Sequence, residues 1–153
     1  MAVTIGELAD RCAAAGLRHH LDAADQAIRV ALVTRAYVNA RAERLAIVRV
    51  EATGHGTHCR VVLERAFATG RHPAATCLAI CDATGDVPFV RVEHDATSHS
   101  LRLVAELPVE DGTMTPRQLF ALIDAVAAAA EAGQAAIAAR RRGRGDAGAR
   151  RVA

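Results

Sequence analysis

Two histidines and two cysteines have side chains of the types that bind transition metals, at spacings that could form a site. His55 and His58 have the spacing H-x-x-H beside two glycines, and Cys77 and Cys81 lie four residues apart. On a helix, that second spacing places the two thiols one above the other. Zinc takes three or four nitrogen and sulfur ligands, and each pair could supply two. One hypothesis is therefore a Cys/His metal-binding or redox protein.

A structural role explains these residues more simply. Neither spacing is that of a zinc knuckle, and Cys77 and Cys81 fall on the apolar face of a predicted helix, where a free cysteine packs like a small hydrophobe. His58 precedes Cys59 directly, and neighbouring residues of a strand point to opposite faces, so His58 cannot act as its base. We expect core cysteines, surface histidines, and no metal, cofactor or catalytic residue.

The carboxylates offer little catalytic chemistry. Glu106, Glu110 and Asp111 cluster near a strand end, but Pro108 and Gly112 mark that segment as a turn, where acidic residues are common. A small enzyme is a second alternative. It would need a concave pocket in which other histidines converge; the candidates are His19, His20, His94 and His99.

The composition describes one globular domain with an uneven charge. The chain has 153 residues, 52% hydrophobic and 24% charged. Residues 1–139 hold 13 arginines against 16 acidic residues, a net charge of −3, whereas residues 140–153 hold six arginines against Asp146, a net charge of +5. We expect a domain over residues 1–139 and a disordered arginine-rich tail over residues 140–153.

The same composition bears on nucleic-acid binding, on membrane insertion and on cellular location. Aromatic residues are only 3% of the chain, so few rings could stack on bases, and nucleic-acid contact is limited to weak, non-specific attraction by the tail. No apolar run approaches the length of about 18 residues that a membrane span needs. The N-terminus lacks a signal-peptide pattern, and four cysteines suit a reducing compartment, so we expect a cytoplasmic protein with no membrane partner.

Hydrophobic periodicity predicts helices at both ends and in the middle. Thr4 and Glu7 form a capping box for a helix at about 4–15, which Gly16 ends. Pro73 begins a helix over residues 72–83, with Ala74, Cys77, Leu78 and Cys81 on one face. Thr115 caps the last helix, whose apolar stripe is Leu119, Leu122, Ile123, Val126 and Ala130.

Alternation at period two predicts the strands. They cover residues 28–33, 45–51 and 59–64, with a hairpin turn at 54–56 and a weaker strand at 18–21. A second hairpin joins a strand starting at Val90 to one at 101–107. The predicted fold class is α+β: an antiparallel β-meander and a second β-hairpin, together five or six strands, flanked by N-terminal, middle and C-terminal helices.

This order of elements resembles the bacterial YbjN-like family, whose fold is shared with class I type III secretion chaperones. The resemblance covers residues 4–138 and is most specific over residues 90–95, 101–112 and 114–124, where Leu-Pro-Val-Glu-Asp-Gly precedes a helix opened by Thr-x-x-Gln. Ile80 and Cys81 replace the leucine-asparagine pair usual in the family. The resemblance implies a chaperone-like or regulatory adaptor protein that binds other polypeptides, commonly as a dimer.

The expected function is therefore non-enzymatic protein binding, of a client or of a second copy. Four apolar residues alternate against the residues assigned to the core and would form an exposed patch on the sheet. These partner-binding candidates are Val33, Leu45, Ile47 and Val62. We expect a homodimer.

Overall fold

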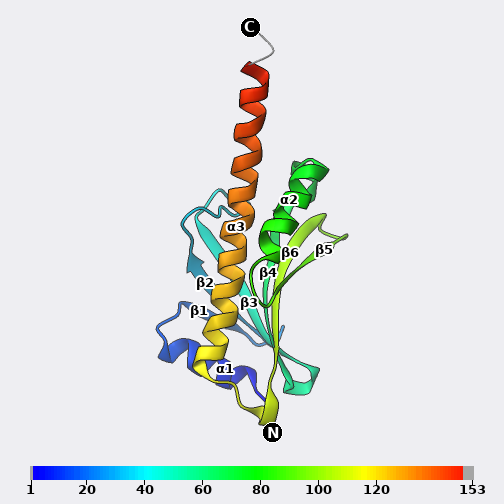
Figure 1. Cartoon of the computed structure of the whole chain (residues 1–153). Helices are drawn as coiled ribbons and strands as arrows, with labels where there is room; N and C mark the ends of the chain where they lie inside the picture. Colours follow the sequence, from blue (N-terminus) through cyan, green and yellow to red (C-terminus); the bar gives the residue numbers. More distant parts are fainter. Residues whose placement is uncertain (1, 150–153) are drawn as a thin grey trace.

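The computed structural model describes residues 2–149. It contains one sheet of six antiparallel strands and three α-helices, which confirms the predicted α+β class. In chain order the elements are α1 (Ile5–Ala14), β1 (His19–Asp22), β2 (Ala27–Val33), β3 (Leu45–Thr53), β4 (His58–Ala68), α2 (Ala74–Gly85), β5 (Val90–Asp95), β6 (Ser100–Pro108) and α3 (Pro116–Ala149). The strand order across the sheet is β1-β2-β3-β4-β6-β5 (Figure 1).

The helix starts follow the local signals in the sequence. Thr4 and Glu7 form the predicted capping box, with the Glu7 carboxylate 2.8 Å from the Thr4 backbone nitrogen. Thr115 and Gln118 make the same reciprocal contacts before α3. Gly16, at φ 68°, adopts the left-handed conformation directly after α1.

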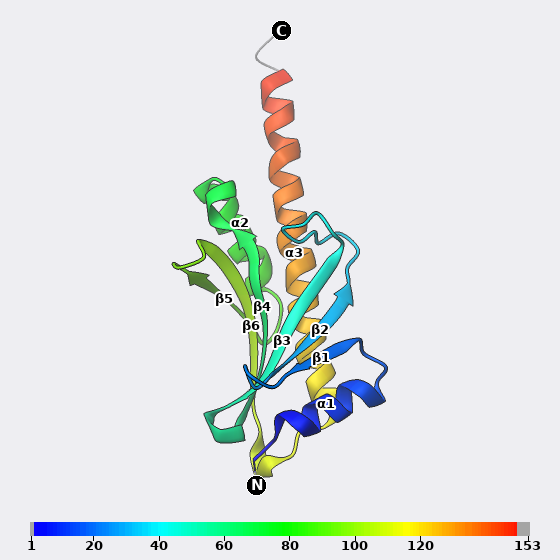
Figure 2. The same ribbon diagram turned by 180° about the vertical axis from the view of Figure 1, so that it is seen from behind.

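One hydrophobic core lies between the sheet and the helices. The long helix α3 runs across one face, with α2 beside it and α1 at the lower end, as Figures 1 and 2 show from the two sides. The predicted stripe of α3 is buried against β3, β4 and β6. Gly133 allows the closest approach, since a Cβ atom there would lie 2.5 Å from the Phe67 ring.

A polar contact fixes α3 to the loop between β2 and β3. The Glu131 carboxylate accepts hydrogen bonds from the backbone N–H groups of Arg35, Ala36 and Tyr37, the last two at 2.7 and 2.8 Å. The Tyr37 ring meets Phe67 edge-to-face at 5.8 Å between centroids. These contacts hold the loop against the helix.

The buried face of α2 differs from the predicted one. Thr76, Ile80 and Thr84 point into the core, whereas Leu78 is 65% exposed. The two threonines read as polar in the sequence, but Thr84 donates its hydroxyl hydrogen to the Ile80 carbonyl oxygen at 2.8 Å, which satisfies the group within the helix. Because its hydroxyl is hydrogen-bonded in this way, Thr84 can occupy a buried position.

Helix α3 also differs from the prediction at its C-terminal end. It continues through residues 140–149, where the sequence suggested a disordered tail; residues 150–153 of that predicted tail lie outside the described residues. Arginine and alanine are good helix formers, and extension of an existing helix needs no new nucleus, although the three glycines of this segment each oppose it by about 1 kcal/mol. Arg140, Arg141 and Arg142 are exposed, so this part of the helix does not enter the core.

The helical stretch Pro116–Gly143 is long and apolar enough to cross a membrane by length and composition, because it contains an 18-residue window with a mean hydropathy of 1.4. The expectation concerned unbroken apolar runs, and Asp124 and Glu131 interrupt this one, so average hydropathy identifies a candidate that the search for an unbroken run did not. The difference comes from alanines, which raise the mean hydropathy without forming a run of large apolar side chains. In the structure, 39% of that window is buried, and its large apolar residues pack on the sheet as in a core helix.

Candidate functional site

The sheet has one face under the helices and one face that no helix crosses within residues 2–149 (Figure 2). Strand alternation assigns each residue to one of these faces. Val48 and Val50 of β3 are fully buried in the core, while Arg49 and Glu51, which alternate with them, stand on the other side. We call that other side the open face.

Three of the four predicted partner-binding residues form an exposed apolar group at one corner of the open face. Val33 pairs with Leu45 across β2 and β3, and Ala31 pairs with Ile47. Val33 is 89% exposed and Ile47 is 48% exposed, with Leu45 half-buried. We call Ala31, Val33, Leu45 and Ile47 the corner patch.

The fourth predicted residue, Val62, lies on the open face but is not exposed. Its side chain is 4% accessible, and its neighbour Val104 on β6 is fully buried. Val62 pairs with Arg49 on one side, and Val104 pairs with Arg91 on the other. Long arginine side chains cover apolar surface with their aliphatic stems, which explains why alternation alone misassigned Val62.

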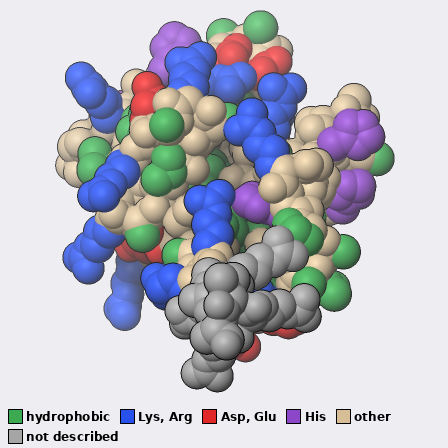
Figure 3. Space-filling model, turned by 90° about the horizontal axis from the view of Figure 1, so that it is seen from above, with side chains coloured by type: hydrophobic (Ala, Val, Ile, Leu, Met, Phe, Trp, Pro, Cys, Tyr) green, Lys and Arg blue, Asp and Glu red, His purple; other side chains and the backbone are tan. Residues whose placement is uncertain are grey.

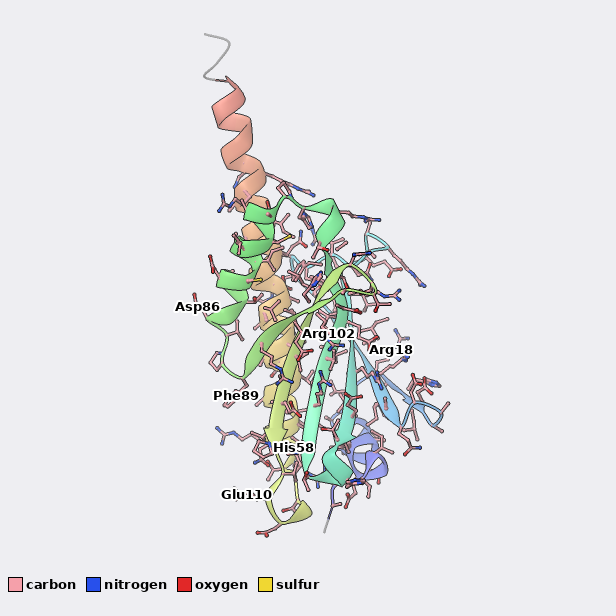
Figure 4. The ribbon with its side chains drawn as sticks, turned by 90° about the vertical axis from the view of Figure 1, so that its right-hand side faces the viewer. Arg18, His58, Asp86, Phe89, Arg102 and Glu110 are labelled. Atoms are coloured by element: carbon pink, nitrogen blue, oxygen red, sulfur yellow. The ribbon has the colours of Figure 1, made fainter. Side chains whose placement is uncertain are left out.

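A lattice of ion pairs occupies the centre of the open face. Its contacts join β3, β4, β5 and β6 at nitrogen-to-oxygen distances of 2.6–3.6 Å. The members of this ion-pair lattice are Arg49, Glu51, Arg60, Glu64, Arg91, Glu93, Arg102 and Glu106. Figure 4 shows Arg102 among the side chains that stand on the sheet.

Sequence reasoning missed this lattice, although a signal was present. Arg49-Val-Glu51 and Arg91-Val-Glu93 repeat opposite charges at period two, which places both charges of each pair on one side of a strand. The pairing between strands depends on the sheet order, in which β6 rather than β5 follows β4.

Glu93 is the centre of the lattice. Arg60, Arg91 and Arg102 all lie within 3.3 Å of its carboxylate oxygens. Burial acts to raise the pKa of Glu93, but hydrogen bonds from Arg91 and Arg102 and the charges of Arg102 and Arg60 outweigh it, so the pKa is lowered. Glu93 is therefore ionised at neutral pH.

The predicted metal ligands do not converge. His55 lies in the turn before β4 and His58 begins that strand, whereas Cys77 and Cys81 lie on α2. Figure 4 places His58 at the lower end of the sheet, away from α2 at the upper end. No group of three or more histidine, cysteine, aspartate or glutamate side chains within the described part of the chain could hold a metal ion.

The burial of the four cysteines differs from the prediction. Cys12 and Cys59 are fully buried, while Cys77 and Cys81 are half-buried on α2, with Cys81 packed against the edge of the core. Burial is the main cause that raises the pKa of Cys59 to about 12, with smaller contributions from Cys12 and Glu51. The Cys59 thiol is therefore neutral and inaccessible, which is unsuited to nucleophilic chemistry.

The remaining enzyme candidates are also dispersed. His19 and His20 lie on β1 and His94 on β5, at opposite edges of the sheet, while His99 lies in the turn before β6. Of the clustered carboxylates, Glu110 and Asp111 lie in a turn, as predicted, and Glu106 pairs with Arg91 at 2.9 Å. No shared pocket results from these positions.

Comparisons with protein-family models, curated proteins and solved structures found no match. The resemblance to the YbjN-like family stays a prediction.

Proposed function

We propose that this protein is a non-enzymatic, cytoplasmic protein-binding module, chaperone-like or adaptor in type, that acts as a homodimer. The observation that carries the proposal is the corner patch, where Val33 is 89% exposed on a sheet face without covering helices. The expected YbjN-like resemblance agrees with this role, and the four free thiols agree with a reducing compartment.

A second copy of the chain is the occupant that suits this surface. The arginines of the ion-pair lattice are matched by glutamates of the same chain, so an identical face approaching it meets paired charges and no excess of one sign. In a twofold arrangement, Val33 of one protomer packs near Ile47 of its partner. Such an interface is isologous and closes on itself as a dimer.

The corner patch supplies the free energy of association. Fully burying one valine, leucine or isoleucine side chain is worth about 1.5–3 kcal/mol relative to exposure. Val33, Leu45 and Ile47 occur twice in a dimer, so their burial offsets the loss of translational and rotational freedom. The expected dissociation constant is in the micromolar range.

Sedimentation equilibrium at micromolar protein concentrations tests this proposal. The wild type should be a dimer, and Val33→Glu and Ile47→Glu should each be monomeric, because a buried unpaired carboxylate opposes association. Leu78→Glu is the matched control, since Leu78 is an exposed apolar residue of α2 outside the patch. A wild-type monomer, or dissociation caused equally by Leu78→Glu, would overturn the proposed homodimer.

A further inference from the structure

A second surface feature lies at the end of the molecule where α3 emerges from the domain. There, a cleft of about 440 Å³ is bounded by α3, the end of β4, the segment before α2, the β2–β3 loop and the turn before β6. Its charged and polar lining residues include Arg65, Arg71, His72, Ser98, Gln134 and Arg141. We call it the basic cleft.

An adjoining depression of about 150 Å³ extends the positive charge. It shares Arg71, His72 and Arg141 with the basic cleft and adds Arg140. No aspartate or glutamate lines either hollow. Figure 3, viewed from this end, shows many arginine side chains and few acidic ones. Arg65 and Arg71 come from residues 1–139, which carry a net charge of −3, whereas Arg140 and Arg141 belong to the basic C-terminal segment.

The cleft arginines are not neutralised by the protein within residues 2–143. Arg65, Arg71, Arg140 and Arg141 make no ion pair there, in contrast to the paired arginines of the ion-pair lattice. Two carboxylates next to the cleft lining are hydrogen-bonded to neutral side chains and not to the cleft arginines. Asp95 accepts a hydrogen bond from the Ser98 hydroxyl at 2.7 Å, and Glu43 accepts one from the Asn39 amide at 2.9 Å.

The backbone gives Arg65 an unusual position on the cleft. The β4–β6 register shifts between Leu63 and Phe67, and Arg65 within that irregularity has φ 51°, in the left-handed region. This conformation favours glycine, and bulges of this kind redirect a side chain out of the regular alternation. Arg65 thereby reaches the cleft that Arg71 and Arg141 line from other elements.

We propose that the basic cleft binds a small molecule carrying two or more phosphate groups, with Arg65, Arg71 and Arg141 as the phosphate ligands. Guanidinium groups form bidentate, charge-assisted hydrogen bonds with phosphate oxygens. The cleft volume lies within the usual range of small-molecule sites, which is about 300–1,000 Å³. Ser98 and Gln134 supply polar groups at its walls.

A bounded small-molecule site fits the surface better than a nucleic-acid groove. The phenyl ring in the lining, that of Phe67, is buried in the core and not free to stack on bases. Arg142, beside the cleft arginine Arg141, does not line either hollow. If the ligand binds in the cleft, substituting Arg141 should therefore weaken its binding, whereas substituting Arg142 should not.

Isothermal titration calorimetry of the full chain with pyrophosphate tests the proposal. The wild type should bind, and Arg71→Ala and Arg141→Ala should each weaken binding by about tenfold, the loss expected for one charge-assisted contact. Arg142→Ala is the matched control on the same helix and should leave the affinity unchanged. Absence of binding, or equal weakening by Arg142→Ala and Arg141→Ala, would overturn the proposal.

Two further probes distinguish the source of the phosphate. A single-stranded oligonucleotide presents phosphate groups on a polymer, and vesicles containing phosphatidylserine present them on a lipid surface. Both should compete poorly with pyrophosphate for the wild type, and their weak binding should fall with salt and with Arg142→Ala. Tighter binding of either one than of pyrophosphate would overturn the small-molecule assignment.

Discussion

The ring of Phe67 on β4 occupies the space that a side chain on Gly133 of α3 would need. A Cβ atom at Gly133 would lie 2.5 and 2.8 Å from two carbons of that ring and 3.3 Å from Ile80. The glycine therefore sets the distance between the helix and the sheet, next to the basic cleft, which Phe67 also lines.

Gly133→Ala should destabilise the protein despite the higher helix propensity of alanine. Overpacking costs about 1–3 kcal/mol, and the gain in propensity returns about 1 kcal/mol, so we expect a net loss of up to about 2 kcal/mol. Urea unfolding measures it. Gly143→Ala, on the same helix with nothing within 4 Å of the added atom, should instead be neutral or stabilising. Equal effects at both positions would contradict the steric explanation.

Arg65→Gly should separate stability from ligand binding. Glycine removes the strain of a left-handed arginine, worth about 1–2 kcal/mol, but adds freedom to the unfolded chain, so the net gain is up to about 1 kcal/mol. Pyrophosphate affinity should fall at the same time. Ala42→Gly, at φ 63° outside the cleft, should raise stability without changing affinity. Lower stability in Arg65→Gly would show that its backbone is not strained.

Glu131 should make stability depend on pH. Burial acts to raise its pKa, but backbone hydrogen bonds from Arg35, Tyr37 and Ala36 lower it below the ordinary value of 4.5. A lowered pKa in the folded state stabilises the protein above 4.5, and this contribution is lost as the pH falls through the folded value. Relative to Glu131→Gln, the wild type should be more stable at pH 7 by about 1–2 kcal/mol. Denaturant unfolding at several pH values should show the difference shrinking in acid; a constant difference would contradict the assignment.

His72 should report the occupancy of the basic cleft. Burial is the first cause that lowers its pKa from 6.5, followed by the charges of Arg141 and Arg71. NMR titration of the ring should therefore give a pKa below 6.5 that rises in Arg141→Ala. Bound pyrophosphate should also raise it, because a nearby anion favours the imidazolium form. An unchanged pKa with saturating ligand would place the phosphate elsewhere.

Local signals in the sequence were sufficient for the starts of the first and last helices. The Thr4–Glu7 and Thr115–Gln118 caps act within three residues, and the structure confirms both. The period-two alternation that predicted a strand at 101–107 likewise agrees with the burial of Leu101 and Leu103 in the core. These features depend on backbone hydrogen bonding and side-chain period, which neighbouring residues determine.

The sites depended on contacts between distant segments, which the sequence pattern does not contain. Val62 was expected to be exposed, but Arg49 from another strand lies beside it. The arginine-rich segment was treated as an isolated tail, yet its continued helix carries Arg141 to the same cleft as Arg65. Predicting the burial of Val62 requires the strand order, and predicting the position of Arg141 requires the length of α3.

The contact between Glu131 and the β2–β3 loop has a kinetic consequence. The carboxylate and the Tyr37 amide that it binds are 94 residues apart in the chain. Contacts of such high sequence separation pay the entropy of closing a long loop before they contribute stability. We therefore expect residues 35–37 to become ordered late during refolding, after α3 has docked, and to be among the first backbone amides to exchange with solvent when that helix end detaches.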